Sequence, residues 1–172
     1  MANALTDPPF AANPPVKLNV NAKILGLVIG ILALIGLILS LIALPVVFAL
    51  NSVVSSYCGY YGVSCGSSGI FLLALLGVIV SIVGDILYAV GGFQMYGGNR
   101  AGKGKVIYGL IINLIGGVLQ IVGYGGILGF IFSLIVAIVV YYLVVISRFP
   151  GETPLVASPS GGYGTPPPPP PA

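Results

Sequence analysis

A single acidic residue, Asp85, lies within the apolar stretch 70–95, in the segment "SIVGDILYAVGG". A carboxyl group in such surroundings is costly to bury, so it normally pairs with other polar groups. Two kinds of chemistry follow for Asp85. It can relay a proton or a cation, or it can accept hydrogen bonds that hold neighbouring helices together.

Other polar side chains recur near Asp85 at helical spacing. Ser81 and Tyr88 lie one turn on either side of it, and Asn113 and Gln120 share one face of the next apolar stretch. In an antiparallel helical hairpin, Asp85 lies at the depth of Asn113, whose amide can donate a hydrogen bond to it. Gln120 lies about two turns further along the same face. These five residues predict a polar seam between two helices.

The sequence leaves the role of the polar seam open. A transport path usually contains several ionisable groups, whereas the apolar stretches contain one acid and no base. This favours a structural role, in which Asp85 holds helices together. The two interpretations differ for Asp85→Asn, because a packing contact tolerates the nearly isosteric amide and proton carriage does not.

The elements that must position the polar seam are four long apolar stretches. Hydrophobic residues make up 58% of the 172-residue chain and charged residues only 5%, whereas a soluble domain carries about a quarter charged residues. Each stretch is long enough to cross the roughly 30 Å hydrocarbon core as a helix. We expect an all-α, integral membrane four-helix (tetraspan) up-down bundle over residues 23–148. The expected spans are 24–50, 70–95, 106–122 and 127–147.

The positive charges indicate the orientation of this bundle. All six cations precede the first span, lie between the second and third, or follow the fourth: Lys17, Lys23, Arg100, Lys103, Lys105 and Arg148. Four spans place them on one face, which the positive-inside rule makes cytoplasmic. We therefore expect both termini in the cytoplasm, an outer loop at 51–69, and location in the plasma membrane or a membrane envelope.

Two cysteines lie in the expected outer loop. Cys58 and Cys65 occur in "SSYCGYYGVSCGSS", where an oxidising compartment permits a disulfide. The alternative is a pair of free thiols. A metal site is not expected, because two Cys with no His and no nearby acid supply too few ligands.

Small residues form stripes on all four expected helices. In lipid, small side chains let helix backbones approach closely. We expect the stripes to pack within the bundle, with association to a second copy or to another membrane protein as the alternative, since a GxxxG pattern is a weak signal. The residues assigned to helix packing are Gly26, Gly30, Gly84, Gly91, Gly116, Gly117, Gly129 and Ser133.

Both ends of the chain are rich in proline. Residues 1–22 and 149–172 lack apolar periodicity, which predicts disordered or extended cytoplasmic tails. The C-terminal tail ends in "TPPPPPPA". Six consecutive prolines favour a polyproline II helix, which aromatic-lined grooves can bind. The tail is therefore either a spacer or a ligand for a cytoplasmic partner, and deletion of residues 160–172 distinguishes the two.

Several function classes lack the residues that they need. The chain has no His, which excludes a Ser-His-Asp triad and His-based metal sites. We expect no cofactor, no enzymatic activity and, with a net charge of only +3, no nucleic-acid partner. The segment 97–105, "GGNRAGKGK", lacks the spacing of a phosphate-binding loop and is interpreted as a basic turn near lipid headgroups.

The layout is similar to that of claudin-like tetraspan proteins in its topology and its cysteine pair, Cys58 and Cys65. The chain has no Trp, so it lacks the Trp-containing first-loop motif of claudins, and it lacks the Cys-Cys-Gly of tetraspanins. The leading hypothesis is a non-enzymatic accessory or structural subunit of a membrane assembly or envelope, in contact with lipid, other membrane proteins or further copies of itself. The alternative is a small oligomeric proton or cation channel or carrier that uses Asp85.

Overall fold

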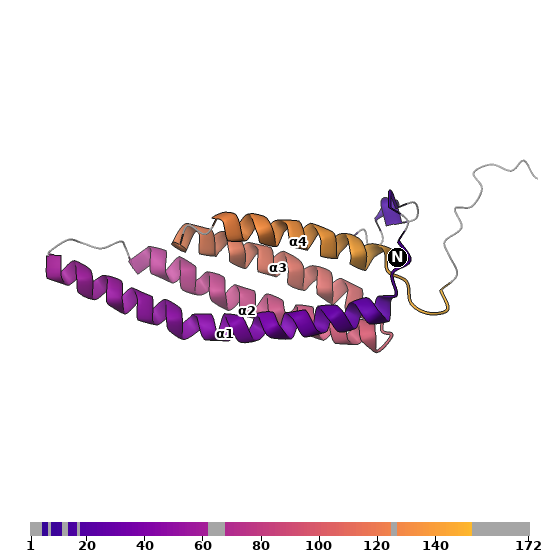
Figure 1. The fold of residues 1–172 in the computed structure, drawn as a ribbon, viewed down its shortest axis with the longest axis horizontal. Coiled ribbons are helices and arrows are strands. Elements are labelled where there is room, and N and C mark those ends of the chain that lie inside the picture. Colours follow the sequence, from indigo (N-terminus) through magenta and orange to yellow (C-terminus); the bar gives the residue numbers. More distant parts are fainter. Residues whose placement is uncertain are drawn as a thin grey trace, which may run out of the picture.

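The main elements of the chain are four long α-helices. The computed structural model describes residues 5–6, 8–11, 14–16, 18–61, 68–124 and 127–152. The helices are α1 (Ala22–Tyr61), α2 (Ser68–Tyr96), α3 (Ala101–Tyr124) and α4 (Ile127–Ile146), as Figure 1 shows. Each is long and apolar enough to cross a membrane. The predicted all-α, four-helix membrane bundle is therefore confirmed.

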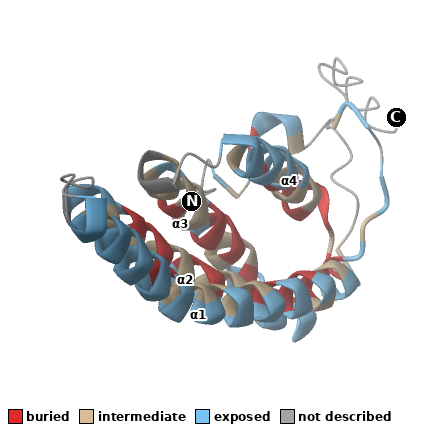
Figure 2. Cartoon of the chain, turned by 60° about the vertical axis from the view of Figure 1, so that its left-hand side comes forward, coloured by how far each residue is buried: buried red, intermediate tan, exposed pale blue. Residues whose placement is uncertain are grey.

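The helices run up and down in sequence order, and each packs on the next. The contact between α2 and α3 is the most extensive, followed by that between α1 and α2, whereas α1 and α4 barely touch. In Figure 2, α4 lies across an open side of the bundle from α1, and the buried residues of α1, α2 and α3 face inward. Helices α1, α2 and α3 therefore pack closely against one another in sequence order, whereas α1 and α4 make little contact.

The turn between α2 and α3 is built by two consecutive residues. Gly98 has a φ of 84°, and its N–H donates to the Met95 carbonyl while the Asn99 N–H donates to the Gln94 carbonyl. This pattern is a Schellman motif, in which glycine tolerates the left-handed conformation. The Asn99 side chain then caps α3 by accepting from the Ala101 N–H at 2.9 Å. Helix α2 therefore ends, and α3 begins, within a few residues of this turn.

The start of α1 is tied to the end of α4. Asn21 caps α1 by accepting from the Lys23 N–H at 2.9 Å. An isolated bridge joins Asn21 to Arg148: the Ala22 N–H donates to the Arg148 carbonyl, and the Arg148 N–H donates to the Val20 carbonyl. The chain therefore enters and leaves the bundle at the same end, as Figure 1 shows.

Helix α1 is longer than the sequence indicates. The first span was expected to end at Leu50, but α1 continues to Tyr61, so residues 51–61 of the expected outer loop are helical. Two hydroxyls in this extension bond within the helix: Ser52 donates to the Ala49 carbonyl and Ser56 to the Ser52 carbonyl. With 40 residues, α1 is about 60 Å long, twice the thickness of the hydrocarbon core.

Pro45 lies inside α1 rather than near its end. A proline inside a helix is expected to bend the helix or to end its regular part. The helix continues beyond it, and Figure 1 shows α1 curved along its length. Bending without termination fits a proline whose missing N–H removes one helical hydrogen bond.

The described part of the N-terminal segment is held against α4, although the sequence predicts an extended tail. Phe10, in the short 3-10 helix Pro9–Ala11, stacks on Tyr142 with ring centroids 6.3 Å apart. The Tyr142 hydroxyl donates to the Val16 carbonyl at 2.9 Å, and the Tyr141 hydroxyl donates to the Leu5 carbonyl at 3.3 Å. Tyr141 and Tyr142 therefore dock the N-terminal segment on α4.

Candidate functional site

Asp85 joins three helices. Its carboxylate accepts a hydrogen bond from the Asn113 amide of α3 at 2.8 Å through Oδ1, and one from the Ser40 hydroxyl of α1 at 2.9 Å through Oδ2. Asp85 itself lies on α2 and is only 9% exposed. Both carboxylate oxygens therefore have a donor, which offsets part of the cost of placing the group among apolar helices.

A second polar contact lies along the same interface, one turn from Asp85 on α2 and two turns from Asn113 on α3. The Gln120 amide of α3 donates to the Ser81 hydroxyl of α2 at 3.0 Å. Gln120 makes no direct bond to Asp85, as expected from the helical spacing. The structure thus brings Ser81, Asp85, Asn113 and Gln120 together in one row, with Tyr88 on the same face of α2.

The row depends on the close approach of α2 and α3. Three glycine pairs face each other across the two helices at intervals of seven residues: Gly77 with Gly116, Gly84 with Gly109, and Gly91 with Gly102. A Cβ atom added to any of these glycines would lie 3.0 Å or less from backbone of the facing helix. Such a distance leaves no room for a side chain. The predicted packing role thus has a direct geometric basis at Gly84, Gly91 and Gly116.

A similar glycine contact joins α1 to α2. A Cβ atom on Gly26 would meet the Gly92 carbonyl at 2.6 Å, and one on Gly92 would meet the Gly30 N at 2.6 Å. The GxxxG pattern of α1 therefore packs within the bundle in this structure. It holds α1 against the same helix that carries Asp85, and so brings Ser40 within reach of the carboxylate.

A cavity of about 460 Å³ adjoins the polar seam. Asp85, Tyr88 and Asn113 line it from one side, and Phe132 and Ser133 of α4 from the other. The remaining lining residues include Gly36, Leu39 and Ser40 of α1, Gln120 and Gly117 of α3, and Phe130, Val136 and Ala137 of α4. The cavity lies where α1 and α4 make little contact, so the carboxylate faces a space that can hold a small molecule, water or an apolar chain.

The stripe on α4 is only partly packed. Gly117 of α3 lies against the Phe130 ring, and Ala137 is buried. Ser133 lines the cavity, whereas a Cβ atom on Gly129 would meet nothing within 4 Å. Of the two α4 positions assigned to helix packing, Gly129 therefore makes no close contact within the described bundle, and Ser133 lies at the cavity wall.

Ser40 is the functional residue that sequence reasoning missed. It stands in the uniformly apolar stretch "LILSLIAL", which has no polar periodicity to mark one face. The sequence signal that could have found it is its status as the only polar side chain between Lys23 and Asn51. A lone hydroxyl in a membrane helix normally forms a hydrogen bond. Asp85, the one acid in the four apolar stretches, is the acceptor that the sequence offers.

One polar atom in the row stays unpaired. The side-chain oxygen of Asn113 is buried and has no hydrogen-bond partner among the described residues. It points toward Gly84, because a Cβ atom on Gly84 would collide first with this oxygen.

The described residues contain no group of three His, Cys, Asp or Glu that could hold a metal ion.

Cys58 lies near the end of α1 and is not a free thiol. Its predicted partner, Cys65, lies outside the described residues, so the Cys58–Cys65 disulfide stays a prediction. The C-terminal tail from residue 153 onward also lies outside the described residues.

Comparisons with known proteins do not add to this geometry. The chain matches no protein-family model, and comparisons with curated proteins and with solved structures give no match either. What the four apolar helices show is an integral membrane protein.

Proposed function

We propose that the chain is a non-enzymatic accessory or structural subunit of a membrane assembly or envelope. The observation that carries this proposal is that both oxygens of Asp85, and the Ser81 hydroxyl beside it, accept hydrogen bonds from neighbouring helices. Asp85 accepts from Ser40 and Asn113, and Ser81 accepts from Gln120. Groups engaged in this way hold α1, α2 and α3 together and are not displayed for chemistry on a substrate.

The outward surface of the bundle supports contacts with lipid or with other membrane proteins. Large apolar side chains on α1 and α4 that do not line the cavity are exposed, including Ile42 at 56%, Ile135 at 56% and Ile138 at 60%. Lipid chains or the helices of a partner, including a second copy, can cover these faces. A membrane subunit needs such a surface, whereas a catalytic site needs convergent polar groups.

The charge distribution supports a cytoplasmic location for both termini. The described cations Lys23, Arg100, Lys103, Lys105 and Arg148 all lie at or near the helix ends where the chain enters and leaves the bundle. The positive-inside rule then places the far end of α1, with Cys58, on the outer side. This orientation suits a plasma membrane or envelope protein with an outer disulfide, and it leaves the Pro-rich tail free to meet a cytoplasmic partner.

A second candidate function is favoured by the cavity beside the polar seam. An oligomeric proton or cation channel or carrier needs an ionisable group that faces an accessible space, and Asp85 lines a cavity of about 460 Å³ together with Tyr88 and Asn113. Against this role, the four helices contain no second acid, and both oxygens of Asp85 already accept hydrogen bonds.

Flux measurements in liposomes separate the two functions. The full chain is reconstituted as wild type, as Asp85→Asn and as the control Ser133→Ala, which changes the cavity wall but leaves the carboxylate. We expect proton and K⁺ flux equal to that of empty liposomes for all three proteins. Flux through wild type and Ser133→Ala that Asp85→Asn abolishes would overturn the accessory function in favour of the channel.

Whether the chain is part of a larger assembly is tested by measuring the protein mass of the particle that contains it. The protein is solubilised from its native membrane in a polymer that retains the surrounding lipid, and the mass of the particle is measured after subtraction of lipid and polymer. A subunit is expected to give a protein mass larger than the 17.5 kDa of one chain. A protein mass equal to one chain under these conditions contradicts the proposal.

A further inference from the structure

A second cavity lies at the end of the bundle where the chain enters and leaves. Its volume is about 790 Å³, and it opens between the start of α3 and the segment that follows α4. Arg100, Lys103 and Arg148 line it, together with one acid, Glu152. Among the described residues that line the cavity, three cations stand against one carboxylate, although the whole chain carries only +3. This described part of the lining therefore carries an excess of positive charge.

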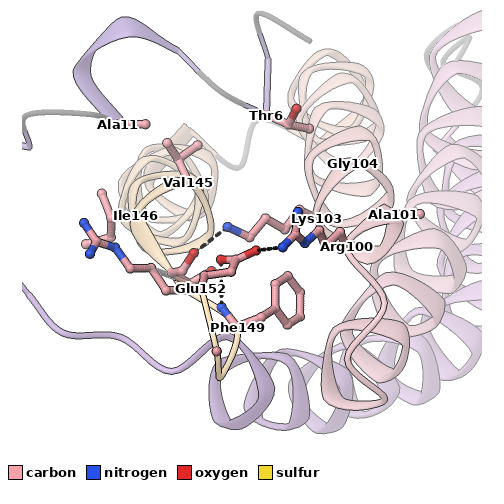
Figure 3. Close-up of a pocket in the computed structure, with 13 residues that line it drawn as sticks. Thr6, Ala11, Arg100, Ala101, Lys103, Gly104, Val145, Ile146, Phe149 and Glu152 are labelled. Atoms are coloured by element: carbon pink, nitrogen blue, oxygen red, sulfur yellow. Dashed lines mark hydrogen bonds and ion pairs between the residues drawn. The ribbon is translucent and has the colours of Figure 1, made fainter. Parts of the chain in front are cut away.

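The cavity already recognises an anionic group of the chain itself. The Arg100 guanidinium contacts the Glu152 carboxylate at 2.8 Å, and the Phe149 N–H donates to the other oxygen of the same carboxylate at 3.1 Å. Figure 3 shows Arg100 and Lys103 reaching from the α3 side toward the segment that carries Glu152. A guanidinium beside a backbone N–H is a donor set that suits carboxylate and phosphate oxygens alike.

The second cation, Lys103, contacts the same segment after α4 that carries Glu152. Its ammonium donates to the Ser147 carbonyl and lies 5.7 Å from the centre of the Phe149 ring. Ser147 and Phe149 are themselves buried, at 2% and 7% exposed. The positive charge of Lys103 therefore belongs to an ordered wall of the cavity, unlike a lysine that extends into solvent.

We propose that this cavity binds a phosphate group, supplied by an anionic lipid headgroup or by a soluble phosphate ester, in competition with Glu152. The cavity is far larger than the single carboxylate that it holds, and its cations come from the α2–α3 turn, from α3 and from the segment after α4. It lies at the helix ends, the level at which headgroups meet a bundle. The proposal is independent of the accessory function, because it concerns neither Asp85 nor the outward faces.

The competition with Glu152 makes the proposal testable by a gain of binding. Glu152→Gln removes the internal anion and frees Arg100, so phosphate affinity is expected to rise several-fold. Arg100→Gln removes a charge-assisted contact, so affinity is expected to fall about tenfold. The matched control is Lys105→Gln, which removes a cation from α3 that does not line the cavity and should change affinity by less than about twofold.

The experiment has one arm for each source of phosphate. In the lipid arm, native mass spectrometry of the full chain counts bound phosphatidylglycerol against zwitterionic phosphatidylcholine. In the soluble arm, inorganic phosphate is titrated into the protein in a neutral detergent and the midpoint of thermal unfolding is followed. Selective lipid binding with no response to inorganic phosphate assigns a headgroup, and a response to inorganic phosphate assigns a soluble ester.

Three results would overturn the site. The first is equal binding of both lipids together with no response to inorganic phosphate. The second is a loss with Lys105→Gln as large as that with Arg100→Gln, which indicates a diffuse basic surface. The third is an affinity for Glu152→Gln no higher than that of wild type. A misfolded protein cannot mimic the expected gain, so the Glu152 variant keeps the test decisive.

Discussion

Gly84 and Asn113 face each other across the α2–α3 interface, with no space for a side chain between them. A Cβ atom on Gly84 would lie 2.7 Å from the Asn113 Cγ and 3.0 Å from its backbone N. The residue next to Gly84 is Asp85, whose carboxylate accepts a hydrogen bond from the Asn113 side-chain amide at 2.8 Å. The absence of a side chain at one position thus allows the hydrogen bond at the next.

Gly84→Ala is therefore expected to separate α2 from α3 and to break the bond between Asp85 and Asn113. Overpacking of this kind costs about 1–3 kcal/mol of stability. The measurement is the free energy of unfolding in mixed micelles. Gly129→Ala is the matched control, because a Cβ atom there meets nothing within 4 Å, and the better helix propensity of Ala should leave stability equal or slightly higher. Equal effects of the two substitutions would contradict the packing role of Gly84.

Ser40 contributes to the bundle through its bond to Asp85. Ser40→Ala should cost about 0.6 kcal/mol, the average for hydrogen bonds between membrane helices, with about 1.7 as the upper end. The cost should vanish in an Asp85→Leu background, where no acceptor remains. A double-mutant cycle in the same micelles measures this coupling, with Ser133→Ala as a control that has no bond to Asp85. A coupling energy of zero would show that the α1–α2 contact does not depend on this bond.

The polar seam shows where sequence reasoning succeeds. The pairing of Asp85 with Asn113 follows from two constraints, the helical repeat and the antiparallel direction that a short turn imposes. The turn at Gly98 and Asn99 ends α2 and begins α3 within a few residues, so it fixes the register of the two helices. Between the first two spans the sequence predicts a long outer loop at 51–69, and a loop of that length fixes no register. Helical register therefore does not pair Asp85 with Ser40 of α1, and only the isolation of this hydroxyl in an apolar stretch singles it out.

Two other features differ from the sequence prediction. The first span was expected to end at Leu50, yet α1 continues to Tyr61, and the Ser52 and Ser56 hydroxyls in this extension bond to the helix backbone. The N-terminal segment shows no apolar periodicity, and it is held by the rings of Phe10 and Tyr142, which are far apart in the chain.

Docking of the N-terminal segment on α4 is tested by proteolysis. Phe10→Ala removes the ring that stacks on Tyr142 and lies edge-on to Tyr141, and aromatic pairs contribute about 0.5–1.5 kcal/mol beyond the area that they bury. Cleavage within the first twenty residues should therefore be about two to ten times faster than in wild type. Tyr96→Phe, which alters an exposed tyrosine at the end of α2, should leave the rate unchanged. An unchanged rate for Phe10→Ala would show that the rings do not hold the segment.

The orientation and the disulfide are tested together by labelling in intact cells. A membrane-impermeant maleimide applied outside should label Cys58 and Cys65 only after reduction, because an outer disulfide protects both thiols. In a Cys58→Ser, Cys65→Ser background, a cysteine placed by Asn99→Cys should be labelled only after the membrane is made permeable. Labelling of Asn99→Cys from outside would reverse the topology, and labelling without reduction would exclude the disulfide.

The length of α1 has a mechanical consequence. Its first turns are clamped by the bridge to Arg148 and by the glycine contacts to α2, while Tyr57, Tyr60 and Tyr61 at its other end are exposed. Helix α1 is a rod of about 60 Å that stays in contact with α2 as far as Phe48, whose ring packs on that of Phe71. The turns beyond Phe48 act as the moving arm of a lever. A small change of tilt within the bilayer is therefore amplified into a large displacement of the three tyrosines on the opposite side of the membrane.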